Sequence, residues 1–174
     1  MSDETNNADS AGDNGGNGAA QQPAGPPSVR LVAHYIRDLS FENVAAQEGA
    51  QPGGQPEISV HVNLDASAVS DTRVQVGMKI EAKAVTGEQT RFMVELDYLG
   101  IFELVNIPQD HVHPALFIEC PRLLLPYARR VVSDVTRDGG FPPLMLDNVD
   151  FGQLYQMRMA ELQAQQAAQG SADA

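Results

Sequence analysis

The chain has few of the residues from which covalent, metal-bound or membrane-spanning structure is built. It contains one cysteine, Cys120, and no tryptophan among 174 residues. A single cysteine excludes an intramolecular disulfide framework and any metal site that needs several thiolates. No apolar run approaches the roughly 20 residues of a membrane-spanning helix, and no basic start followed by an apolar stretch marks a secretory signal. We therefore expect a globular cytoplasmic protein with no direct membrane insertion.

Positive charge is also scarce. Lys79 and Lys83 are the only lysines, and 23 acidic against 11 basic residues give a net charge of −12. Because binding to nucleic acid depends on clustered lysine and arginine, we expect no nucleic-acid partner. An acidic protein instead attracts basic surfaces and cationic chain segments.

Large apolar side chains are missing from both ends of the chain. Residues 1–27 contain no Val, Ile, Leu, Phe or Tyr, and residues 163–174 are only Gln, Ala, Gly, Ser and Asp. Such segments cannot bury enough apolar surface to offset the entropy lost on ordering. We predict disordered tails over 1–27 and 163–174, around one folded domain of residues 28–162.

The first half of that domain shows the pattern of strands. Apolar residues recur at every second position in four segments, which is typical of half-buried strands: 29–41, 58–64, 74–84 and 90–98. In the first segment the residues in step are Leu31, Ala33, Tyr35, Leu39 and Phe41. Thr86-Gly87-Glu88 marks a hairpin turn. The pattern predicts a four-stranded antiparallel sheet, a meander, with one face buried and one exposed to water.

The second half changes to helical spacing, with two apolar stripes after His113: Leu116, Cys120, Leu124, Val131 and Val135, and Phe117, Leu125 and Val132. A helix that is apolar on two sides must be buried on two sides. Proline lacks a backbone donor, so Pro121 and Pro126 predict a kink, with regular helix from about Pro126 to Arg137. Asp150 is expected to cap a last helix. The fold class is therefore α+β, a sheet with a long, kinked helix and a C-terminal helix.

Motifs for catalysis are sparse. The sequence has no P-loop, no G-x-G-x-x-G and no G-x-S-x-G. His111 and His113 are spaced as two ligands could be, but a zinc site needs a recognisable second pair. We expect no cofactor, no metal and no enzymatic activity; the alternative of another class is a small metal-dependent enzyme using His111 and His113. Glu119 beside Cys120 would raise the thiol pKa, which predicts a buried, inert thiol.

Six short motifs occur in a fixed order: Arg37-Asp38-Leu39-Ser40-Phe41-Glu42, Gln55-Pro56-Glu57, Gly100-Ile101-Phe102, Cys120-Pro121, Leu125-Pro126-Tyr127-Ala128-Arg129 and Gly140-Phe141-Pro142-Pro143-Leu144. Through them, residues 28 to about 160 resemble the SecB family of bacterial protein-export chaperones. The resemblance implies an ATP-independent chaperone that holds precursor proteins unfolded in the cytosol and delivers them to the translocation ATPase SecA. It also implies a homotetramer, a dimer of dimers with its long helices between two outer sheets. Within the family, the alternative is a chaperone dedicated to one client, such as an antitoxin.

The resemblance also implies two sets of site residues. The SecA contact would be made by the outer face of the sheet, at Asp38, Glu42, Met93 and Glu95. The client groove would be formed by apolar residues of several segments: Val60, Val62, Phe92, Val94, Leu96, Phe141, Phe151, Leu154 and Tyr155. Because successive side chains of a strand point to opposite faces, Glu95 is expected on the face opposite to Phe92, Val94 and Leu96.

Overall fold

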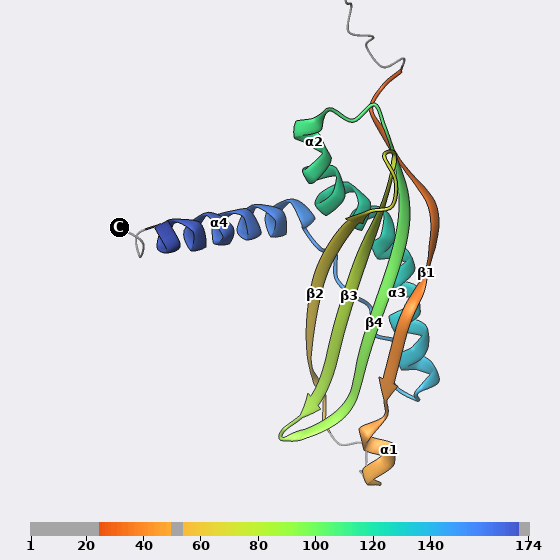
Figure 1. The fold of residues 1–174 in the computed structure, drawn as a ribbon. Coiled ribbons are helices and arrows are strands. Elements are labelled where there is room, and N and C mark those ends of the chain that lie inside the picture. The colour runs from red at the N-terminus through yellow and green to blue at the C-terminus, as the bar shows by residue number, and fades with distance from the viewer. Residues whose placement is uncertain (1–24, 50–53, 171–174) are drawn as a thin grey trace, which may run out of the picture.

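The structure, a computed structural model, describes residues 25–49 and 54–170 (Figure 1). Its elements in chain order are β1 (Ser28–Glu42), α1 (Val44–Glu48), β2 (Glu57–Ala68), β3 (Arg73–Thr86), β4 (Gln89–Val105), α2 (Gln109–Pro114), the π-helical turn η1 (Ala115–Glu119), α3 (Cys120–Asp138) and α4 (Phe151–Gly170). The α+β class predicted from the sequence is confirmed. Most of the tail predicted over 1–27 lies outside the described residues. The short helix α1 was not predicted.

The four strands form one antiparallel sheet in the order β1-β4-β3-β2. β2, β3 and β4 form the expected meander, but β1 pairs with β4 and not with β2. The predicted simple meander is therefore wrong for β1. The connection between β1 and β2 includes α1 at the end of the sheet (Figure 1).

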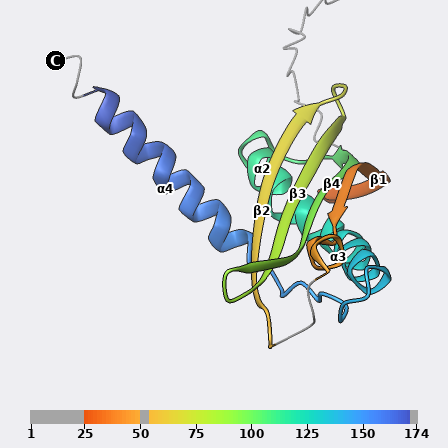
Figure 2. The same cartoon turned by 90° about the horizontal axis from the view of Figure 1, so that it is seen from below.

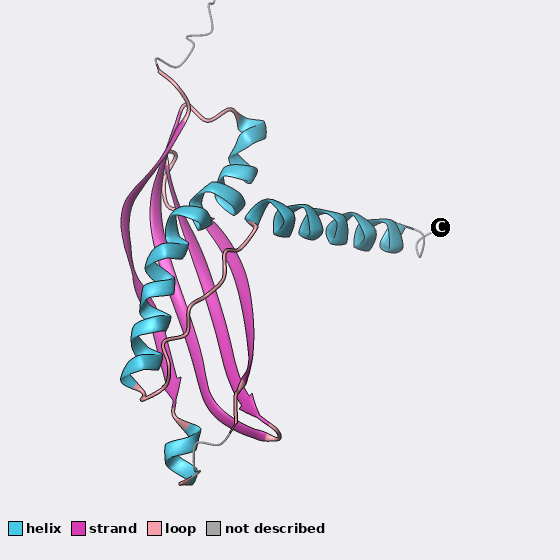
Figure 3. Ribbon diagram, turned by 180° about the vertical axis from the view of Figure 1, so that it is seen from behind, coloured by secondary structure: helices cyan, strands magenta, loops and turns pink. Residues whose placement is uncertain are grey.

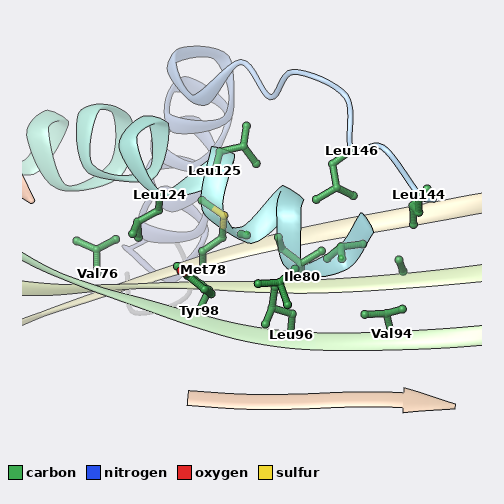
Figure 4. Close-up of a cluster of buried hydrophobic side chains, with 14 of the residues drawn as sticks. Val76, Met78, Ile80, Val94, Leu96, Tyr98, Leu124, Leu125, Leu144 and Leu146 are labelled. Atoms are coloured by element: carbon green, nitrogen blue, oxygen red, sulfur yellow. The ribbon is translucent and has the colours of Figure 1, made fainter. Parts of the chain in front are cut away.

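α3 lies along one face of this sheet (Figure 3). The core between them combines β3, β4 and α3, as Figure 4 shows for Val76, Met78, Ile80, Val94, Leu96, Tyr98, Leu124 and Leu125. A glycine on β4 allows the helix to approach closely. A Cβ atom at Gly100 would lie 2.6 Å from a methyl group of Leu124, a separation that packed atoms do not adopt. In the part of the chain that the structure describes, no helix lies on the other face of the sheet (Figures 1 and 3).

The irregularity predicted in the long helix lies earlier than expected. α3 runs without a break from Cys120 to Asp138 and includes Pro126, and the π-helical turn precedes it. Pro121 falls in the first turn of α3, where a backbone N–H has no partner within the helix, so proline is tolerated. The helix ends at Asp138, one residue after the predicted end, and two glycines follow it. Gly140 has φ of 84°, and the N–H of Phe141 donates to the carbonyl of Thr136 at 3.1 Å.

The segment 139–150 returns along the same face of the sheet, beside α3 (Figure 3). Its Leu144 and Leu146 are buried in one cluster with Leu125 and Val132 of α3. Two residues of the second apolar stripe, Leu125 and Val132, are therefore covered within the same chain.

The last helix begins where the sequence predicts. The N–H of Gln153 donates to the Asp150 carboxylate at 3.0 Å, which is the predicted cap. α4 then projects from the body (Figure 2) and stays helical to Gly170, beyond the predicted domain end at residue 162. Alanine and glutamine, which dominate this stretch, are good helix formers. Among the described residues, no helix has the length and apolar character needed to cross a membrane.

Candidate functional site

The uncovered face of the sheet carries the residues predicted to contact SecA. In the pairing of β1 with β4, Asp38 lies opposite Asp97, Ser40 opposite Glu95, and Glu42 opposite Met93. Residues directly opposite each other in a sheet share a face. Asp38, Glu42, Met93 and Glu95, which we call the acidic face, therefore lie together, and the β1–β4 pairing is the reason.

Cations also lie on this face: Lys83 is directly opposite Met93, and Arg37 and Lys79 contact carboxylates. Arg37 Nε donates to Asp97 at 2.8 Å. Lys79 Nζ lies 2.8 Å from a Glu81 carboxylate oxygen and 4.0 Å from one of Glu95. The hydrogen bond from Lys79 lowers the pKa of Glu81 and raises that of Lys79. The Glu95 side chain is 60% exposed, so its charge is available to a docking partner.

An apolar groove lies on the opposite side, where β2 faces α4. It has a volume of about 430 Å³, and apolar side chains of β2, η1 and α4 line it, among them Val62, Leu64, Phe117, Leu154, Tyr155 and Met157. β2 is an edge strand. Ile58 and Val60, on the same face of β2 as Val62, are 47% and 39% exposed, so the apolar surface continues along the strand.

The structure divides the predicted client residues into two groups. Val62, Leu154 and Tyr155 line the groove, and Val60 lies beside it on β2. A second set is packed in the core of the single chain, at 3% exposure or less: Phe92, Val94, Leu96 and Phe151. A client would touch these four side chains only if the core opened.

Phe141 belongs to neither group. It is half-buried at the start of the returning segment. Its ring centroid lies 4.8 Å from that of Phe92 and 6.5 Å from that of Phe41. These three rings form a cluster of their own, separate from the lining of the groove.

Some lining residues were not predicted. Leu64 continues the alternation of Val60 and Val62, so the sequence pattern held the signal for it. His113 was considered only as a metal ligand, yet its Nδ1 lies 3.0 Å from the hydroxyl of Tyr155, 42 positions away. No spacing rule connects two residues so far apart in the sequence.

The two histidines of the metal hypothesis have different neighbours. His113 bonds to Tyr155, and His111 Nε2 lies 3.8 Å from a carboxylate oxygen of Asp110. Within residues 25–49 and 54–170, no three His, Cys, Asp or Glu side chains gather as metal ligands would. Cys120 is fully buried, and burial, with a smaller contribution from Glu119, raises its thiol pKa to about 12. The prediction that this thiol is buried is confirmed, and its inertness stays a prediction.

Comparison with known proteins identifies the family to which this fold belongs. The family model described as preprotein translocase subunit SecB matches residues 21–162. The chain belongs to the SecB family. The match extends from before β1 to Leu162 in α4, so it includes the acidic face and the residues that line the groove.

Relatives and a solved structure agree with this assignment. The protein-export protein SecB of Bradyrhizobium sp. (strain BTAi1) is 52% identical over 155 residues, which are 88% of this chain and 96% of the relative. That of Dinoroseobacter shibae is 47% identical over 176 residues, 99% of each chain. The chain is therefore a protein-export chaperone, as its resemblance to SecB implied.

A SecB-like chaperone of Mycobacterium tuberculosis, solved in complex with a peptide from the HigA1 antitoxin, is similar in fold. The TM-score is 0.54 at 12% sequence identity, over 70% of this chain and 90% of that one. An identity this low supports the SecB fold alone.

Proposed function

We propose that this chaperone holds unfolded precursor proteins in its apolar groove without ATP and delivers them to SecA through its acidic face. One observation carries the proposal: an apolar groove and a negatively charged surface lie on opposite sides of the same sheet. A client and a docking partner can then bind at the same time, because neither covers the surface that the other uses.

The groove suits clients of many sequences. Its affinity comes mainly from apolar area removed from water, about 25 cal/mol per Å² before the costs of association. Met157, 55% exposed at the groove, has a flexible side chain that adapts to different shapes. β2 has a free edge whose backbone groups can pair with an extended chain. Phe92, Val94, Leu96 and Phe151 belong to the core beside the lining residues and not to the lining itself.

The acidic face suits a basic surface of SecA. Like-charged carboxylates on one face produce a field that attracts a positively charged partner and orients its approach. Asp38, Glu42 and Glu95 provide the charge, and Met93 provides an apolar contact among them.

The proposed assembly is a homotetramer, a dimer of dimers, in the cytoplasm. Leu123 and Tyr127 on α3 are 42% and 39% exposed, and Ile36 and Leu39 on β1 are 43% and 38% exposed. The ring of His34 on β1 stacks on Tyr127 with centroids 4.1 Å apart, so the apolar side chains of the two elements are neighbours. Apolar surface of this extent is typical of an interface between subunits.

A narrower function, service to one client such as an antitoxin, has support from the peptide bound to the M. tuberculosis chaperone. The more similar relatives carry the name of protein-export proteins, which favours general export. We propose no enzymatic activity, in keeping with the family of export proteins to which the chain belongs.

The experiment is a holding assay with a urea-unfolded precursor protein, which follows how much the chaperone delays refolding. Leu154→Asp places a charge in the groove and should weaken binding at least tenfold. Met145→Asp is the matched control, because Met145 is 63% exposed on the returning segment and does not line the groove. Equal losses in the two variants would contradict the proposed client site.

A further inference from the structure

α4 is fixed to the body by its first turn. The side chain of Phe151 is 1% exposed in the core, and Asp150 caps the helix. Tyr155 follows four residues later, on the same side of the helix, and contacts His113. Beyond this turn the helix projects from the body (Figures 1 and 2), and its residues to Leu162 line the groove beside β2.

His113 lies between the body and this helix. Its Nδ1 is 3.0 Å from the Tyr155 hydroxyl. The His113 ring centroid is 4.8 Å from that of Phe117 in η1 and 5.4 Å from that of Tyr155 in α4. All three side chains line the groove. The imidazole of His113 therefore contacts Phe117 of the body on one side and Tyr155 of α4 on the other.

We propose that His113 is a positioning residue of the client groove: by bonding to Tyr155 it fixes the direction of α4 and so the width between α4 and β2. The consequence for clients rests on the proposed function, because it takes the groove as their binding site. The consequence for α4 does not depend on clients.

A small shift at Tyr155 produces a larger displacement farther along α4. With a rise of about 1.5 Å per residue, Tyr155 lies about 6 Å along the axis from Phe151, and Leu162 lies about 16 Å along it. A helix that pivots at Phe151 therefore turns a shift of about 1 Å at Tyr155 into nearly 3 Å at Leu162, which lines the groove. Loss of the Tyr155 contact would let Met157, Met159 and Leu162 move away from Val62 and Leu64.

A groove of variable width should hold a client for a shorter time. Changes within one interface act mostly on the dissociation rate. We expect Tyr155→Phe, which removes only the hydroxyl, to raise the dissociation rate of a urea-unfolded precursor about three- to tenfold, in the range of one hydrogen bond. His113→Phe should have the same effect. His113→Gln keeps a hydrogen-bonding group and should recover part of the loss.

The position of α4 can be measured without a client. Spin labels on Ser59→Cys in β2 and Gln163→Cys in α4 report the distance across the groove in the full-length chain, diluted with unlabelled chain. Cys120 is fully buried and does not compete for the label. Tyr155→Phe and His113→Phe should broaden the distance distribution and shift it to longer values. Tyr35→Phe, on the outer face of β1 and outside the groove, should leave it unchanged.

The outcomes separate the two proposals. An unchanged distance distribution in Tyr155→Phe and His113→Phe would overturn the positioning role. The positioning role would also be overturned if the two substitutions acted independently. In that case the increase in dissociation rate in the double variant would equal the product of the increases in the two single variants. If the distances change as expected but Leu154→Asp holds precursors normally, the proposed client site fails and the positioning of α4 by His113 stands.

Discussion

The hydroxyl of Thr136 on α3 accepts a hydrogen bond from the backbone N–H of Leu144 at 2.9 Å, and it donates one to the carbonyl of Val132 at 2.9 Å. Thr136 is fully buried. One side chain thus fixes the returning segment to the long helix, and with it the leucines that cover α3 and the chain that leads to α4. The direction from which α4 starts is set partly by this bond.

Replacing Thr136 with valine keeps the shape and removes the hydroxyl. The N–H of Leu144 would be left buried without a partner, which costs about 1–3 kcal/mol. We expect Thr136→Val to lower the free energy of unfolding by this amount, measured by urea unfolding at constant protein concentration. Ser133→Ala is the control, since it removes a hydroxyl that donates to the sulfur of the exposed Met145 at 3.5 Å. A loss as large in the control would show that the buried bond is not the cause.

Cys120 predicts how stability depends on alkaline pH. Burial raises its thiol pKa from an ordinary value of 9.0 to about 12 in the folded chain. The unfolded chain therefore releases the thiol proton first, and the stability contributed by the neutral thiol is lost as pH rises above about 9.

Cys120→Val removes this titration and should flatten the fall of unfolding free energy between about pH 9 and 11, measured by urea unfolding at each pH. Iodoacetamide should leave the native thiol unmodified at pH 8 and modify it once urea unfolds the chain. Rapid modification of the native protein would show that the thiol is accessible.

The alternation of apolar and polar residues predicts where the strands are but not how they pair. Period-two spacing located the four strands, but it does not name their partners, and β1 is found beside β4. It also fails within β1, where the register shifts after Leu31 and after Ile36. Ala33 and Tyr35 consequently share the outer face with Ile101 and Leu99, although they were predicted to be in step with Leu39.

The two surfaces were predictable to different degrees. Glu95 was expected on the face opposite to Leu96, and the pairing of the strands agrees. The gathering of Asp38 and Glu42 beside it depended on family resemblance, because only the β1–β4 pairing creates it. The contact of His113 with Tyr155 results from the packing of distant segments, which no local pattern encodes.

The apolar surface of α3 predicts a test of assembly. Four chains of 18.7 kDa would give a mass of about 75 kDa by light scattering. Leu123→Asp places a charge on the exposed side of α3, where an unpaired charge at an interface costs several kcal/mol, so we expect smaller species that keep their fold. Leu124 is fully buried within the single chain, and Leu124→Asp should instead unfold it. Undiminished mass in a folded Leu123→Asp variant would place the interface elsewhere.

The last prediction concerns the division of work between the two faces of the sheet. Glu95→Lys reverses a charge that is 60% exposed and lies 4.0 Å from Lys79, so it also creates repulsion at the centre of the acidic face. Binding to SecA should weaken about tenfold or more, while precursor holding stays unchanged, because Glu95 and the groove lie on opposite faces. The matched control is Glu88→Lys, the same change of charge at the exposed hairpin turn.

Both variants should be titrated with SecA, and separately with a urea-unfolded precursor, at several salt concentrations. Exposed charges are screened over about 8 Å at physiological ionic strength, so the affinity of the unmodified chaperone for SecA should fall with salt. The difference in SecA affinity between the unmodified chaperone and Glu95→Lys should also become smaller as salt rises. Precursor binding, which is mainly apolar, should change little. If Glu88→Lys weakened SecA binding as much as Glu95→Lys, net charge alone would account for docking. If a folded Glu95→Lys protein lost both activities equally, the two faces would not act independently.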